Sequence, residues 1–129
     1  MFNFKISTLA AALVLGITAL AVAPLASAKD GDVRVRGACS QGSTAKLKLS
    51  REDRGIEVEF EVDQNRTGVR WNVVLIQNGR RIARMTRVTQ GRSGSFEARV
   101  LAANRAGKDA FRARATSPSR EVCTAQASF

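Results

Sequence analysis

Few residues of this chain have both the type and the spacing that covalent chemistry needs. Ser43 and Lys46 match the Ser-x-x-Lys pattern of penicillin-recognising enzymes, in which a helix holds the lysine beside the serine. Here they lie at the start of a predicted strand, whose residues alternate between apolar and polar from 45 to 50. Residues three positions apart in a strand have their side chains on opposite faces. Residues 91–95 (Gly-Arg-Ser-Gly-Ser) come close to a nucleophile elbow, but the chain contains no histidine to serve as its base. The sequence therefore predicts a protein that is not an enzyme and has no catalytic residue.

Acidic residues at alternate positions form a second candidate for chemistry. They are Glu57, Glu59, Glu61 and Asp63, and the apolar residues between them predict one strand with all four carboxylates on one face. Folding the preceding run back as a hairpin puts Lys48 opposite Glu57 and Lys46 opposite Glu59. Such cross-strand pairs contribute roughly 0.2–1 kcal/mol each. We therefore interpret the row as a solvated face that holds strand register, and we expect no metal site and no cofactor.

Arginines dominate the charge of the chain, which has 21 Lys and Arg against 11 Asp and Glu and a formal net charge of +10. Some crowd one predicted strand and others lie on outward positions of the next hairpin; together they form a candidate polyanion patch of Arg80, Arg81, Arg84, Arg87, Arg99, Arg112 and Arg114. If these faces adjoin, a polyanion would meet a positive field there. The alternative is that the arginines keep the protein soluble and block pairing between edge strands. We expect no specific nucleic-acid partner, because the aromatic residues occupy inward positions and stacking platforms need exposed ones.

The elements that would position these side chains are strands. Short runs of alternating apolar and polar residues, separated by turn signals, occur about every 8–14 residues from residue 33 to residue 125. Asn78-Gly79 between two such runs is the strongest signal for a tight hairpin, because both central residues of a type I′ turn need positive φ. The pattern predicts an all-β fold, an immunoglobulin- or fibronectin-like sandwich of about 7–8 antiparallel strands. We expect its core to hold Trp71, Phe60, Phe96, Phe111, Leu47 and Leu49.

Cys39 and Cys123 are the two cysteines of the chain, and they lie near opposite ends of the predicted domain. An even number of cysteines in an exported chain indicates a disulfide. The bond would join the first strand region to the last and close a loop of more than 80 residues. In the chain-entropy model such a loop contributes about 4–5 kcal/mol.

Residues 1–28 have the features of a cleavable secretory signal. Lys5 gives a charged start, residues 9–23 are almost entirely apolar, and Ala26 and Ala28 occupy the two small-residue positions of a cleavage site. The apolar run is shorter than the roughly 20 residues of a spanning helix. We therefore predict a single domain over residues 29–129, secreted after cleavage and without a membrane anchor.

Several short segments of the chain form a recognisable set: Gly-Ala-Cys-Ser at 37–40, Leu-Lys-Leu-Ser at 47–50, Ile-Glu-Val-Glu-Phe-Glu-Val-Asp-Gln-Asn at 56–65, Gly-Val-Arg-Trp at 68–71, Asn-Gly at 78–79, Ser-Gly-Ser-Phe at 93–96 and Gly-Lys-Asp-Ala-Phe at 107–111. Together they resemble a family of small secreted actinobacterial proteins with an immunoglobulin- or fibronectin-like β-sandwich. The resemblance implies a fold and a location but no activity. It also places Trp71, Asp63, Asn65 and Asp109 in a shared pattern, which turn chemistry explains as readily as a binding site.

These observations favour a secreted, non-enzymatic binding or surface module. Its extracellular partner is unknown and could be a cell-envelope polyanion, a glycan or a protein, and we expect the chain itself to be a monomer. The alternative is a small secreted inhibitor or ligand-carrier protein, although no reactive-site loop clamped by cysteines is visible. A purely structural or matrix component is a third possibility.

Overall fold

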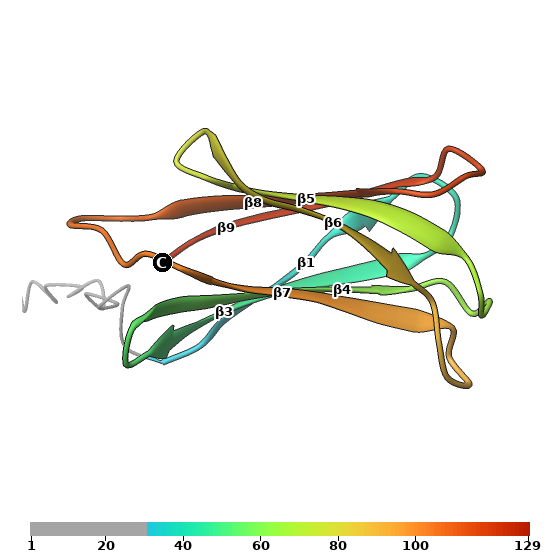
Figure 1. Cartoon of the computed structure of the whole chain (residues 1–129), viewed down its shortest axis with the longest axis horizontal. Coiled ribbons are helices and arrows are strands. Elements are labelled where there is room, and N and C mark those ends of the chain that lie inside the picture. The colour runs from blue at the N-terminus through green and yellow to red at the C-terminus, as the bar shows by residue number, and fades with distance from the viewer. Residues whose placement is uncertain (1–30) are drawn as a thin grey trace, which may run out of the picture.

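The computed structural model describes residues 31–129, and the predicted signal segment therefore lies outside the described residues. These residues form two layers of antiparallel strands that face each other (Figure 1). The strands are β1 (Val33–Arg36), β2 (Ala38–Cys39), β3 (Thr44–Glu52), β4 (Gly55–Asp63), β5 (Arg70–Gln77), β6 (Arg80–Val88), β7 (Ser95–Ala102), β8 (Ala110–Thr116) and β9 (Val122–Ser128). Within this part of the chain there is no apolar helix long enough to cross a membrane.

The strand order is that of an immunoglobulin- or fibronectin-like sandwich, as predicted. Sheet A has the order β1-β3-β4-β7 and sheet B the order β2-β9-β8-β5-β6. The pairs β3–β4, β5–β6 and β8–β9 form hairpins within one sheet, and the chain crosses between sheets after β1, β2, β4, β6 and β7. Such crossings are typical of this class of sandwich. A buried tryptophan on strand C is also typical of it, and β5 occupies the place of strand C here. Alternate residues of each strand thus face the space between the sheets or the solvent.

The chain changes sheets at Gly37, between β1 in sheet A and β2 in sheet B. A Cβ atom at this position would lie 2.4 Å from the backbone oxygen of Thr124, so no larger residue fits without a shift of the backbone. The Gly37 N–H still bonds the Ala45 oxygen of sheet A at 2.8 Å. The two-residue β2 was not predicted as a separate strand, because two residues are too few to show alternation.

The register of the β3–β4 hairpin differs from the predicted one by two residues. Lys48 lies opposite Glu59 rather than Glu57, and Lys46 lies opposite Glu61 rather than Glu59. The strands extend further toward their turn than expected, since Glu52 pairs with Gly55. A shift of two residues leaves every side chain on its predicted face. The alternation that predicted the faces therefore could not distinguish the two registers.

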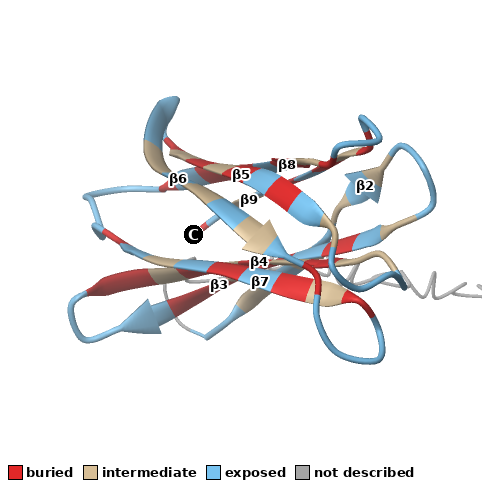
Figure 2. Cartoon of the chain, turned by 45° about the vertical axis from the view of Figure 1, so that its right-hand side comes forward, coloured by how far each residue is buried: buried red, intermediate tan, exposed pale blue. Residues whose placement is uncertain are grey.

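The core lies between the sheets, where buried residues alternate with exposed ones along the strands (Figure 2). All six predicted core residues are at most 5 % exposed: Trp71, Phe60, Phe96, Phe111, Leu47 and Leu49. The rings of Trp71 and Phe96 have centroids 5.8 Å apart and are tilted by 49°. Phe129, not predicted as a core residue, is also fully buried, because the chain ends between the two sheets (Figure 1).

Asn78 and Gly79 form the predicted tight turn between β5 and β6, with φ of 49° and 78°. The Asn78 side chain also forms hydrogen bonds with residues outside the hairpin. Its Nδ2 donates to Asp109 Oδ1 at 2.9 Å, and its Oδ1 accepts from the Ala110 N–H at 2.8 Å. Gln77 Nε2 donates to the same Asp109 oxygen at 3.0 Å. The fully buried Asp109 carboxylate thus ties the β5–β6 turn to the start of β8.

Candidate functional site

The predicted arginine patch is partly assembled by sheet B. Arg81 and Arg112 lie on either side of Ile76, and Arg84 and Arg114 lie on either side of Val74, in two neighbouring rows across β6, β5 and β8. All four arginines are exposed, and the two aliphatic residues between them are half-buried. We call this surface the arginine face; it consists of Arg81, Arg84, Arg112, Arg114, Val74 and Ile76.

The spacing of the four arginines follows from sheet geometry. The two arginines of each row are two strands apart, which corresponds to about 10 Å between their backbones. The rows are two residues apart along β8, about 7 Å. The four Cα atoms therefore lie in two rows on one sheet, with Arg81 and Arg84 three residues apart on β6 because the register shifts between them. An open depression of about 480 Å³, lined in part by Ile76, Arg112 and Gln126, adjoins the face.

The arginine face contains no acidic residue. In residues 31–129 the acids lie on sheet A, just before β1, in the β3–β4 turn, or at the buried positions of Asp109 and Glu121. Its neighbours on the outer side of sheet B are uncharged residues such as Asn72, Thr86 and Gln126. Across the described part of the chain, no ion pair involves Arg81, Arg84, Arg112 or Arg114. Their charge is therefore not neutralised within the domain.

Arg80 and Arg87 belong to the same edge strand but lie at inward positions, opposite Gln77 and Trp71. β6 is an edge strand of sheet B, and Arg80 is exposed at its start. Arg87 Nε donates to the Glu97 backbone oxygen of β7, and its Nη1 donates to the Thr86 oxygen, both at 3.1 Å. Arg87 thus links the two sheets, a role distinct from that of the arginine face.

Arg99, the remaining member of the predicted patch, lies on the other sheet. It is on the outer side of β7, where its Nη2 is 3.0 Å from Glu59 and 3.1 Å from Glu97. Burial raises the pKa of Glu59, the nearby Glu97 raises it further, and Arg99 opposes both effects. Arg99 therefore neutralises the acidic row of sheet A and does not contribute to the arginine face.

Within the described residues, the acidic row is paired with basic residues from two strands, β3 and β7. Lys46 Nζ is 3.5 Å from Glu61, and Lys48 Nζ is 3.7 Å from Asp32 rather than from an acid of the row. The carboxylate oxygens of Glu59, Glu61 and Glu97 lie within 4.8 Å of one another. Lys46 and Arg99 supply positive charge at this point, in agreement with the interpretation of the row as a register-holding surface.

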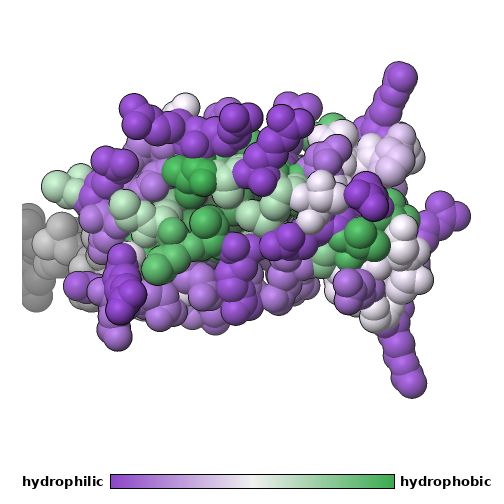
Figure 3. All heavy atoms as spheres, viewed as in Figure 1, coloured by the Kyte–Doolittle hydropathy of each residue, from purple (hydrophilic) through white to green (hydrophobic). Residues whose placement is uncertain are grey.

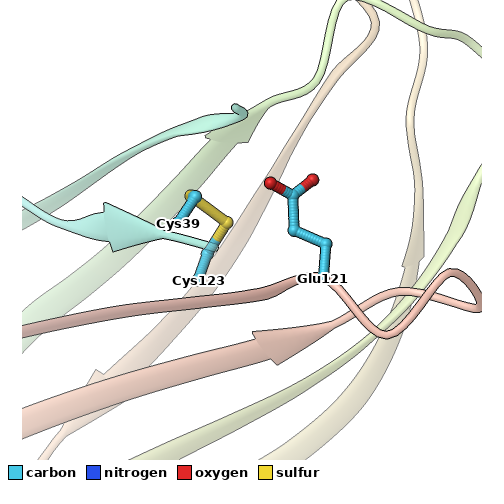
Figure 4. A group of neighbouring side chains, drawn as sticks. All are labelled: Cys39, Glu121 and Cys123. Carbon is cyan, nitrogen blue, oxygen red and sulfur yellow. A yellow bond between two sulfur atoms is a disulfide. The ribbon is translucent and has the colours of Figure 1, made fainter. Parts of the chain in front are cut away.

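Sequence reasoning missed the role of Glu121, which is 2 % exposed and lies beside the disulfide (Figure 4). Its carboxylate accepts from Ser43 Oγ at 2.5 Å, from the Ser43 N–H at 3.0 Å and from the Gln41 N–H at 2.8 Å. Burial by itself raises the pKa of Glu121, but these hydrogen bonds outweigh it and leave the pKa below its ordinary value. Glu121 thus holds the β2–β3 loop against the start of β9.

We expect Glu121→Gln to destabilise the protein by about 1–3 kcal/mol at neutral pH, because an amide nitrogen would face donors that need an acceptor. The folded-state pKa of Glu121 is lowered, so its stabilising effect is present above the unfolded pKa and is lost as the pH falls through the folded one. Urea unfolding between pH 7 and pH 2 should therefore show the difference from wild type shrinking in acid. The exposed Glu52→Gln serves as control, and a difference that does not change with pH would contradict the assignment.

Cys39 and Cys123 form the predicted disulfide, across directly opposed residues of β2 and β9. The bond lies within sheet B and does not cross between the sheets. It attaches β2, which has two residues, to the edge of the sheet. After β4, Asp63 and Asn65 form a local turn in which Asp63 Oδ1 accepts from the Asn65 N–H at 3.2 Å. The turn explanation for these two residues is thereby favoured.

Comparison with known proteins adds no assignment: no protein-family model matches the chain, and no curated protein matches it either.

Proposed function

We propose that this protein is an exported, non-enzymatic binding module whose arginine face holds an anionic polymer. The observation that carries the proposal is the set of four unpaired arginines around two half-buried aliphatic residues on an acid-free face. The disulfide is compatible with an oxidising compartment and supports the export part of the proposal.

A polymer suits this face better than a small anion. A single exposed ion pair contributes between about 0 and 1 kcal/mol, too little to hold an isolated anion. Four arginines that meet successive anionic groups of one chain act together and release the counterions of that chain. Side chains that stay on a rigid sheet also lose less freedom than those on a mobile loop.

The chemistry of the face favours an anionic glycan or a polyol phosphate over single-stranded nucleic acid. Base stacking needs exposed aromatic side chains. In residues 31–129 every aromatic side chain is buried: Phe60, Trp71, Phe96, Phe111 and Phe129. Val74 and Ile76 instead offer small apolar surfaces between the charges, which suit the carbon backbone of a sugar or polyol.

The proposal predicts tight, salt-sensitive binding to heparin or to poly(glycerol phosphate), measured by titration calorimetry at several salt concentrations. For four contacts we expect log K to fall with log salt with a slope of about −3. The double variant Arg84→Glu/Arg114→Glu should weaken binding at least about tenfold, because it places two like charges opposite the polymer.

The matched control is Arg54→Glu/Arg92→Glu, which changes the net charge equally at exposed turn positions away from the arginine face. We expect this control to keep most of the affinity. Equal losses in both double variants would show that net charge alone attracts the polymer, and the proposed face would then be wrong.

A further inference from the structure

Strand β6 has a free edge within residues 31–129, because it pairs with β5 on one side and with no strand on the other. The sandwich is open along this side, between β6 and β7. In the view of Figure 3, apolar surface lies between two bands of hydrophilic side chains on the side where Figure 1 places β6 and β7 toward the viewer. A long unpaired edge is a template for an additional strand.

The backbone groups on this edge can be assigned from the ladder. The Thr89 N–H bonds the Val69 oxygen at 2.9 Å, so Thr89 directs its backbone toward β5. Because orientation alternates along an antiparallel strand, the N–H and C=O groups of Val88, Thr86 and Arg84 point to the open side. The Thr86 oxygen accepts from Arg87 Nη1, as an outward carbonyl should. An incoming strand would thus find donors and acceptors at alternate residues.

Apolar side chains lie directly below this edge. Ile82, Ala83 and Met85 of β6 and Val100 of β7 pack against the core but are incompletely buried. Ile82 has no partner on β5, because the register shifts at this point. Residues 83–88 therefore form the regular part of the edge, above an apolar seam that a further row of side chains could cover.

The charges along the edge identify the kind of strand that fits. Arg84 projects on the outer side, and Arg87 lies over the edge with neutral carbonyl oxygens as its acceptors. A carboxylate would be a stronger acceptor for either guanidinium. Arg84 and Arg87 lie on opposite faces of β6, so a strand with alternating acids can place them beside only one of the two. Because the apolar seam lies on the inner side, the incoming strand should carry its acids on the outer side, beside Arg84, and apolar residues between them, facing the seam.

A second copy of this chain does not meet that description. Pairing of β6 with another β6 would bring arginines together, and like charges opposite each other destabilise a sheet. The other edge strands in residues 31–129 are β1, which is basic through Arg34 and Arg36, the two-residue β2, and β7, whose outward Glu97 is already bound to Arg99. None of them presents an acidic row.

We infer that β6 receives an acidic, extended segment of another protein as an additional strand of sheet B. This mode of recognition takes its affinity from backbone hydrogen bonds and its specificity from alternate side chains. It does not rest on the proposed polymer function, since it uses the edge of the sheet and not its outer face. Arg84 belongs to both surfaces.

The test uses a capped seven-residue peptide of alternating valine and glutamate, titrated into the ¹⁵N-labelled protein. We expect the amides of Arg84, Thr86 and Val88 to exchange at least about tenfold more slowly with hydrogen in the complex, because each would gain a protected environment. A valine–lysine peptide should not bind. If the three amides gain no protection, the inference is wrong.

Two further measurements separate edge pairing from simple charge attraction. A valine–glutamate peptide methylated on the alternate backbone nitrogens that would face β6 keeps its charge but loses its donors. We expect it to bind about tenfold or more weakly, and equal binding would overturn the inference. Thr86→Pro removes one outward donor and should weaken peptide binding similarly; proline is tolerated on the free side of an edge strand.

The matched control is Arg112→Glu, on the arginine face but away from the edge. It should weaken binding of the anionic polymer and leave peptide binding within about threefold, as expected for a change of distant charge. Thr86→Pro should weaken peptide binding and leave binding of the anionic polymer unchanged. Loss of both interactions in both variants would mean that peptide and polymer share the arginine face, which contradicts the separate edge site.

Discussion

Replacing both cysteines, as Cys39→Ala/Cys123→Ala, is expected to lower the free energy of unfolding by roughly 4–5 kcal/mol. The bond joins residues separated by 84 positions, so its loss gives the unfolded chain a large gain in conformational freedom. A domain of this size has a total stability of about 5–15 kcal/mol. The double variant should therefore unfold at a much lower urea concentration.

Urea unfolding followed by the fluorescence of Trp71 measures this effect, since Trp71 is the single tryptophan of the chain. The double variant avoids leaving one free thiol. Hydrogen exchange should also show β2 released first, because within residues 31–129 this two-residue strand pairs with β9 alone. A loss of stability below about 1 kcal/mol would indicate that the disulfide closes a loop already restricted in the unfolded state.

Trp71→Ala is expected to destabilise the domain by about 3–5 kcal/mol, the range for removing a large aromatic side chain from a core. Trp71 is fully buried between the sheets and packs against Phe96. Its Nε1 donates to Gln64 Oε1 at 3.1 Å, which ties the indole to the loop after β4. The substitution would thus leave a cavity and release that loop.

Urea unfolding followed by far-ultraviolet circular dichroism checks this prediction, because the variant lacks the fluorescent residue. Trp71→Phe serves as control: it keeps much of the apolar volume and loses the hydrogen bond, so its stability should fall between those of wild type and Trp71→Ala. The structure indicates that the volume of the indole stabilises the core. Equal stability of the two variants would contradict this.

The candidate site was predictable only in part. The sequence identified the outward arginines of two strands, because strand alternation is a local property that needs no partner. It could not show that Arg112 and Arg114 lie in the same sheet as β6, with β5 between them, while Arg99 lies on the opposite sheet. In the sequence, Arg99 and Arg112 belong to successive runs, and a hairpin between them was as consistent with the pattern as a crossing between sheets.

The buried carboxylates illustrate the same limit. Glu121 follows a turn containing proline, and no spacing rule connects it to Ser43, 78 residues earlier. Asp109 was noted beside a tight turn, but its partners Gln77 and Asn78 come from a distant hairpin. The role of both acids is apparent only in the folded chain, since each accepts hydrogen bonds from a segment that is far away in the sequence.

By itself, the sequence determined an all-β domain and the inward and outward faces of its strands through the alternation of residues. It also determined the Asn78–Gly79 turn, through the residue types, and the pairing of the two cysteines, through their number. Each depends on local chemistry or on a count. The tertiary structure alone decided strand order, the two-residue shift between β3 and β4, and the acid-free arginine face with its open β6 edge. The physical reason is that period-two alternation fixes which side of a sheet a residue occupies, whereas neighbouring strands are selected by packing between distant segments.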